Sequence, residues 1–111
     1  MAITPKVLVP SKVMENTQQQ QYTALNVTSI IDKCTVTNTS ASNVVFSLNI
    51  VADGGTASNA NILIKNRAIA PNQSYHCPEV VGHSMSVNAF ISTIAGTASA
   101  LTLRISGREI S

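Results

Sequence analysis

Runs in which apolar and polar side chains alternate dominate most of the chain. The clearest is VVFSLNIV at 44–51, where every second residue from Val44 is apolar and is expected to face one side of an extended strand. The final run, 100–110, repeats this pattern. Its inward-facing residues are predicted to be Leu101, Leu103 and Ile105. A period of two over such short runs is typical of half-buried β-strands.

Other short runs have the same character and are separated by turn signals. Further extended segments are expected at 30–38, 61–65, 74–77 and 86–94. Asp53-Gly54-Gly55 predicts a tight hairpin turn, and Pro78 is placed to open one helical turn. A helical period is absent over any useful length. We therefore predict an all-β, antiparallel β-sandwich of about seven or eight strands, with either jelly-roll or Ig-like topology.

The first 21 residues differ from the rest. They contain Pro5, Pro10 and the tract Gln18–Gln21. Proline within an apolar stretch favours an edge strand or an extended arm. We assign residues 1–21 to an N-terminal arm and residues 22–111 to the sandwich domain, with a frayed terminus as the simpler alternative. An arm of this kind would be dispensable for folding, so removal of residues 1–14 should leave the domain intact.

Charge is scarce on this chain. Charged residues make up 11% and hydrophobic residues 44%, and the formal net charge is +2. No basic run predicts nucleic-acid binding, and no apolar run approaches the length of a membrane span. The N-terminus also lacks the apolar core of a signal peptide. A neutral polar surface costs less to bury against a protein partner than a charged one, so we expect protein–protein contact.

Candidate chemistry is sparse. Zinc could formally take His76, Cys77 and His83 together with Cys34, yet the paired ligand spacing of zinc sites is missing. Buried free thiols are favoured over a disulfide, because nothing indicates an oxidising compartment. The five acidic residues are spread singly, which gives no acid–base pair. No catalytic, metal or cofactor site is expected, and the chain is not expected to be an enzyme.

Several segments resemble small β-sandwich structural proteins of tailed bacteriophages. The similar segments are 34–40 (CTVTNTS), the strand 44–51, 69–75 (IAPNQSY), 78–82 (PEVVG) and 100–110 (ALTLRISGREI). The length also resembles that of the capsid decoration, or cement, proteins of short-tailed phages. These motifs are strand and turn patterns and include no catalytic signature.

The resemblance implies a location and a partner. Such a protein would be assembled in the host cytoplasm and would sit on the outer capsid surface of the virion. It would bind the major capsid protein, act as a homodimer and bridge neighbouring capsomers. From the sequence we choose the arm and the outward positions of the final strand as contact residues. They are Lys6, Val7, Leu8, Val9, Lys12, Val13, Met14, Thr102 and Arg104.

Two alternatives stay open. The domain is also compatible with a phage tail or head–tail completion protein. It is further compatible with a receptor- or carbohydrate-binding sandwich, although sugar faces usually stack on aromatic rings and aromatic residues are 4% of the chain. Tyr22 and Tyr75 are the plausible stacking residues.

Overall fold

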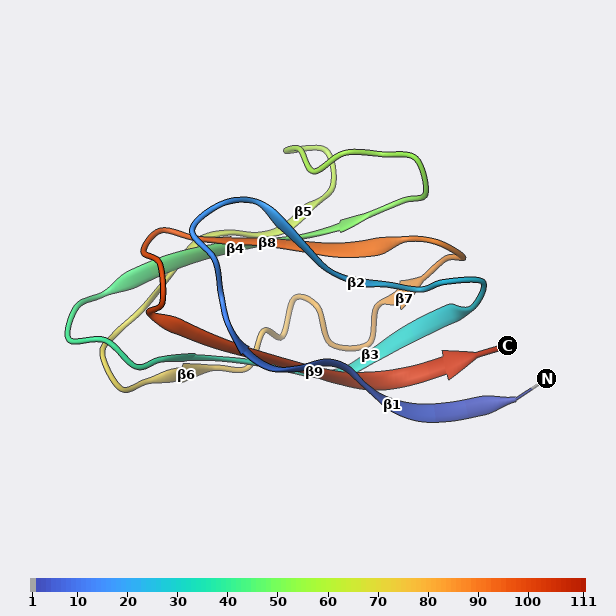
Figure 1. Cartoon of the computed structure of the whole chain (residues 1–111), viewed down its shortest axis with the longest axis horizontal. Coiled ribbons are helices and arrows are strands. Elements are labelled where there is room, and N and C mark those ends of the chain that lie inside the picture. The colour runs from blue at the N-terminus through green and yellow to red at the C-terminus, as the bar shows by residue number, and fades with distance from the viewer. Residues whose placement is uncertain (1) are drawn as a thin grey trace.

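The computed structural model describes residues 2–111 and arranges them in two facing layers of β-strands (Figure 1). The strands are β1 (Ile3–Val13), β2 (Gln19–Thr23), β3 (Thr28–Asn38), β4 (Val44–Val51), β5 (Ile62–Ile69), β6 (Ser74–Tyr75), β7 (Ser84–Met85), β8 (Phe90–Ala95) and β9 (Leu101–Ile110). Every strand pair is antiparallel. The predicted all-β sandwich is therefore confirmed.

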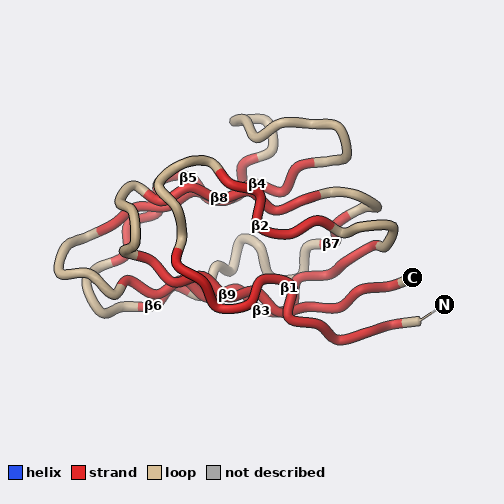
Figure 2. Tube along the Cα trace, in the orientation of Figure 1, coloured by secondary structure: helices blue, strands red, loops and turns tan. Residues whose placement is uncertain are grey.

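The order of the strands resolves the topology that the sequence left open. One sheet, sheet A, has the order β1-β9-β3-β6, with β7 also paired to β3, and sheet B has the order β2-β8-β4-β5. Most connections cross from one sheet to the other, as the tube trace shows (Figure 2). This is the jelly-roll arrangement of two interleaved Greek keys.

Alternation along β4 and β9 builds the core. Val44, Phe46 and Leu48 of β4 are buried between the sheets, as expected from their parity. The inward residues of β9 named above are completely buried as well. Their burial against each other is the main favourable term in folding, at roughly 25 cal/mol per Å² of apolar surface.

The N-terminal segment is part of the sandwich, and this corrects the division at residue 21. β1 pairs with β9 along its length as the edge strand of sheet A, and β2 continues from Gln19 to Thr23 across the expected boundary. Register shifts in β1 on either side of Val9 mark β-bulges. The bulge turns two successive side chains, Leu8 and Val9, toward the core. Of the two alternatives at Pro10, the edge strand is the one observed.

Two smaller expectations concern the segments that flank β7. Residues 78–82 form a single hydrogen-bonded turn, in which Val81 N donates to Cys77 O at 3.4 Å, and the turn does not continue into a helix. The extended segment expected at 86–94 is shorter than predicted, because β8 starts at Phe90 and Val87 lies exposed in a turn. Within residues 2–111 no helix is long and apolar enough to cross a membrane.

Candidate protein-binding surface

The predicted contact residues divide into a surface group and a core group. Leu8, Val9 and Met14 are no more than 5% exposed. They pack in the core, so the prediction that they contact a partner is wrong. The bulge in β1 explains Leu8 and Val9, while Met14 follows the strand where the chain turns toward sheet B. The remaining six lie at the surface: Lys6, Val7, Lys12, Val13, Thr102 and Arg104.

Four of these surface residues come together although they are some ninety positions apart in sequence. In the register of β1 with β9, Val13 lies opposite Thr102. Lys12 follows the same margin, but it lies opposite the buried Leu103 and its ammonium donates to Glu15. Arg104 extends the same margin, because its guanidinium Nη1 donates to Ser11 Oγ at 3.4 Å. The free margin of sheet A therefore carries most of the exposed residues that the sequence selected.

From this margin a neutral face extends across sheet A. Between the buried positions of β3 and β9, Thr35 lies opposite Arg104 and Thr37 lies opposite Thr102. Thr37 also shares a hydrogen bond of 2.9 Å with Ser74 of β6. We call this surface the hydroxyl face, and its members are Ser11, Thr35, Thr37, Ser74, Thr102 and Ser106.

Only a few charges interrupt the hydroxyl face. Arg108 is neutralised by a bidentate pair with Asp32, at 3.0 and 2.9 Å. Arg104 and Lys33 pair with no carboxylate among residues 2–111. The face is thus nearly neutral, with two free cations available to acidic groups of a partner.

A carboxylate organises the passage from β1 to β2. Glu15 accepts hydrogen bonds from Lys12 Nζ at 2.8 Å and from Gln21 Nε2 at 3.0 Å. The hydrogen bond from Lys12, then that from Gln21, lowers the pKa of Glu15 from 4.5 to about 2. The side chain is 40% exposed, so solvent screens much of this interaction.

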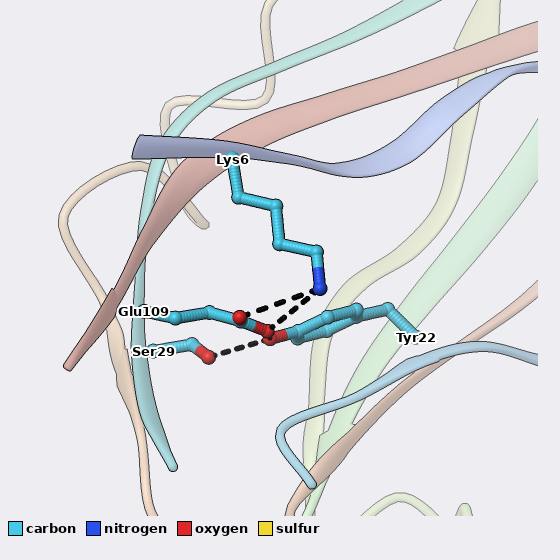
Figure 3. Close-up of polar contacts among 4 residues, drawn as sticks. All are labelled: Lys6, Tyr22, Ser29 and Glu109. Atoms are coloured by element: carbon cyan, nitrogen blue, oxygen red, sulfur yellow. Dashed lines mark hydrogen bonds and ion pairs between the residues drawn. The ribbon is translucent and has the colours of Figure 1, made fainter. Parts of the chain in front are cut away.

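A second polar group ties four strands together near the chain termini (Figure 3). Lys6 Nζ of β1 lies 3.3 Å from both carboxylate oxygens of Glu109 of β9. Tyr22 of β2 donates its hydroxyl to Glu109, and the same hydroxyl shares a 2.7 Å hydrogen bond with Ser29 of β3. We call Lys6, Tyr22, Ser29 and Glu109 the polar clamp.

The hydrogen bonds of the polar clamp stabilise the fold. Burial, followed by the hydrogen bond to Glu109, raises the pKa of Tyr22 to about 12. The phenol therefore stays protonated at neutral pH and acts as a donor rather than as a base. Because Tyr22 comes from sheet B and the other three residues from sheet A, the clamp joins the two sheets.

The cysteines and histidines do not assemble into a metal site among the described residues. Cys34 and Cys77 are free and buried, while His76 and His83 are exposed. A hydrogen bond to Cys34 and then burial raise the pKa of the Cys77 thiol. The thiols thus behave as small interior groups.

Neither tyrosine offers an open ring for stacking. Tyr22 is 9% exposed and belongs to the polar clamp. The ring of Tyr75 is covered by the Arg67 guanidinium, 4.4 Å from its centroid, and meets Phe46 edge-on at 6.2 Å. Stacking of a sugar on aromatic rings, the usual basis of the carbohydrate alternative, has no platform here.

Comparison of the chain with protein-family models, curated proteins and solved structures finds no match. The surface must therefore be interpreted from its own residues. Sequence analysis missed the polar clamp, since Lys6 and Glu109 lie 103 positions apart and no local pattern connects them. Their pairing follows only from the β1–β9 register.

Proposed function

We propose that this chain is a virion structural protein that binds the outer surface of an assembled phage capsid and staples neighbouring capsomers. The proposed partner is the major capsid protein, and the proposed place of the chain is the outer surface of the particle. The sequence resemblance to phage decoration proteins motivates the proposal. A jelly roll alone does not select it, because viral capsid and lectin domains both use this fold.

The observation that carries the proposal is the hydroxyl face with its adjoining β1 margin. A broad, nearly neutral sheet face loses little hydration free energy when a protein covers it. Depletion of charge is also the compositional mark of interface centres, where arginine is enriched. Thr102 and Arg104 lie within this face, and Lys12 and Val13 lie on the adjoining β1 margin.

Binding of this chain would stabilise the assembled shell through thermodynamic linkage. A protein that binds the assembled shell and not its free subunits shifts the equilibrium toward the shell. Each contact can be modest, because many symmetry-related copies act together. We further propose that two copies act as a dimer, since engagement of two capsomers at once raises the effective affinity.

The direct test is co-sedimentation of the purified chain with shells assembled from the coat protein of the same genome. We expect binding to shells, no binding to free coat subunits and a higher melting temperature of the decorated shell. Arg104→Glu should weaken shell binding at least tenfold, because it reverses a free cation of the contact face.

The matched control is Lys65→Glu, which makes the same charge change on sheet B. It should leave shell binding unchanged. Equal weakening by both variants would show a non-specific charge effect, and unchanged binding of the Arg104→Glu variant would contradict the proposed surface.

A further inference from the structure

A small cavity lies on the other side of the molecule, over the outer face of sheet B. Its volume is about 150 Å³. The loop 52–61, which projects beyond sheet B between β4 and β5 in Figure 1, forms one wall. Ser47 and Asn49 of β4 and Ile94 of β8 form the floor, and Gln18 closes the opposite side. The volume corresponds to about five waters, at about 30 Å³ each, or to one ring-sized ligand.

The floor holds an acceptor that the protein leaves open. Asn49 is 3% exposed, and its Nδ2 donates to Ser58 O at 2.9 Å and to Asn61 Oδ1 at 2.7 Å. These bonds fix the orientation of the amide. Its Oδ1 accepts no hydrogen bond from residues 2–111, yet no fully buried polar side-chain atom of these residues lacks a partner. The oxygen therefore faces accessible space, and the cavity is the space that Asn49 lines.

The remaining groups are complementary to an oxygen-rich ligand. Gln18 donates to Ser92 Oγ at 2.7 Å, which leaves its carbonyl free to accept. At the rim, Lys65 Nζ contacts Asn59 Oδ1 at 3.2 Å and pairs with no carboxylate of residues 2–111. No acidic residue lines the cavity. Ile94 supplies an apolar surface beside these polar groups.

We propose that this cavity binds a single sugar residue that carries a carboxylate, such as a uronic acid unit of a glycan. Hydroxyl groups of the sugar would donate to the open carbonyls of Asn49 and Gln18. The carboxylate would pair with Lys65, and a C–H face of the ring would pack on Ile94. This inference is independent of the proposed capsid role, because the cavity and the hydroxyl face lie on different sheets.

The mixture of groups favours a sugar over an acidic side chain of a protein partner. A carboxylate side chain would use Lys65 and leave the acceptors of Asn49 and Gln18 unsatisfied. A sugar acid presents donors and a carboxylate within one ring-sized body, so it matches both parts of the cavity. The absence of an aromatic wall predicts weak binding to one residue, with affinity gained by repetition along a glycan.

The test compares D-glucuronate with D-glucose, which differ by a carboxylate in place of a hydroxymethyl group. Each is titrated into the ¹⁵N-labelled chain, and the amide shifts are followed. We expect glucuronate to shift the amides of residues 47–49, 57–65 and 94, and glucose to bind about tenfold more weakly. Equal affinity for the two sugars, or shifts located elsewhere, would overturn the proposal.

Three variants and one further probe complete the experiment. Lys65→Gln should weaken glucuronate binding about tenfold and leave glucose binding unchanged, while Gln18→Ala should weaken both. Lys33→Gln, on sheet A, is the control and should change neither. The amino acid N-acetylglutamate α-amide, whose backbone groups are blocked and whose side-chain carboxylate is free, tests the alternative ligand. If it binds as tightly as glucuronate, the cavity is a docking point for an acidic side chain and the sugar assignment is wrong.

Discussion

The two tyrosines of this chain make the same kind of hydrogen bond in different surroundings. Tyr22 donates to Glu109 inside the polar clamp. Tyr75 donates to Glu79 at the surface, where its hydroxyl oxygen lies 2.7 and 2.6 Å from the two carboxylate oxygens of Glu79. Burial, ahead of the hydrogen bond to the neighbouring carboxylate, raises the pKa of each phenol to about 12. At the residue scale, burial decides how much each bond contributes to stability.

Tyr22→Phe should lower the free energy of unfolding by about 1–3 kcal/mol, because it removes a partner of buried Ser29 and of Glu109. Urea denaturation at pH 7 measures the change. Tyr75→Phe is the matched control and should cost less than about 1 kcal/mol, since its partner Glu79 is exposed. Equal losses of unfolding free energy in the two variants would show that the hydrogen bonds of the polar clamp stabilise the fold no more than the exposed bond of Tyr75 does.

Protonation of Glu15 should account for part of the stability that the fold loses at low pH. Its pKa is lowered in the folded state, so its contribution is complete above the ordinary value of 4.5 and disappears as the pH falls through about 2. Glu15→Gln should therefore be less stable than the wild type at pH 6, by under about 1 kcal/mol, and equally stable near pH 2. Unfolding free energies at the two pH values measure this, and a constant difference would contradict the assignment.

At the scale of elements, β1 is the strand whose buried residues the sequence pattern failed to predict. The bounds of β4 and β9 were predicted closely, and β9 shows the expected alternation of burial. In β4 the expected inward face is buried from Val44 to Leu48, but Val51, expected on the opposite face, is buried as well and Ile50 is only partly buried. In β1 the bulges break the alternation, so buried Leu8 and Val9 resembled surface residues of an arm. The bulges depend on pairing with β9, which lies at the other end of the chain. The polar clamp depends on the same pairing, and so does the Thr102–Val13 contact.

The structure predicts that removal of residues 1–14 abolishes cooperative folding, contrary to the arm hypothesis. The deletion takes Leu8, Val9 and Met14 from the core. Each buried apolar side chain contributes about 1.5–3 kcal/mol, and a domain has only about 5–15 kcal/mol in total. Near-UV circular dichroism and a thermal melt of the truncated chain test this. A sharp, native-like melt of the truncated chain would contradict this prediction and support the hypothesis that residues 1–14 form a dispensable arm.

Gly107 should be irreplaceable for a different reason. A Cβ at this position of β9 would lie 2.1 Å from the backbone oxygen of Ile30 on β3, and backbone cannot move aside cheaply. Gly107→Ala should therefore cost more than about 3 kcal/mol or prevent folding. Gly54→Ala, in an open turn with φ of 80°, should cost only about 1 kcal/mol. Chemical denaturation of both variants checks the contrast.

At the scale of the whole molecule, the jelly roll presents two surfaces of different character. Sheet A offers the hydroxyl face and the β1 margin, and sheet B offers the cavity beneath the loop 52–61. A chain attached through sheet A would keep the sheet B cavity open to the medium. The proposed staple and the proposed sugar site are therefore geometrically compatible, and each can fail without the other.

The copy number of this chain in purified virus particles tests the central claim most directly. Quantitative mass spectrometry against the major capsid protein measures it. A capsid staple should be present at about one copy for every few coat subunits, because each local contact between capsomers needs its own staple. A handful of copies per particle would place the chain at the tail or portal vertex, and its absence from particles would contradict a structural role.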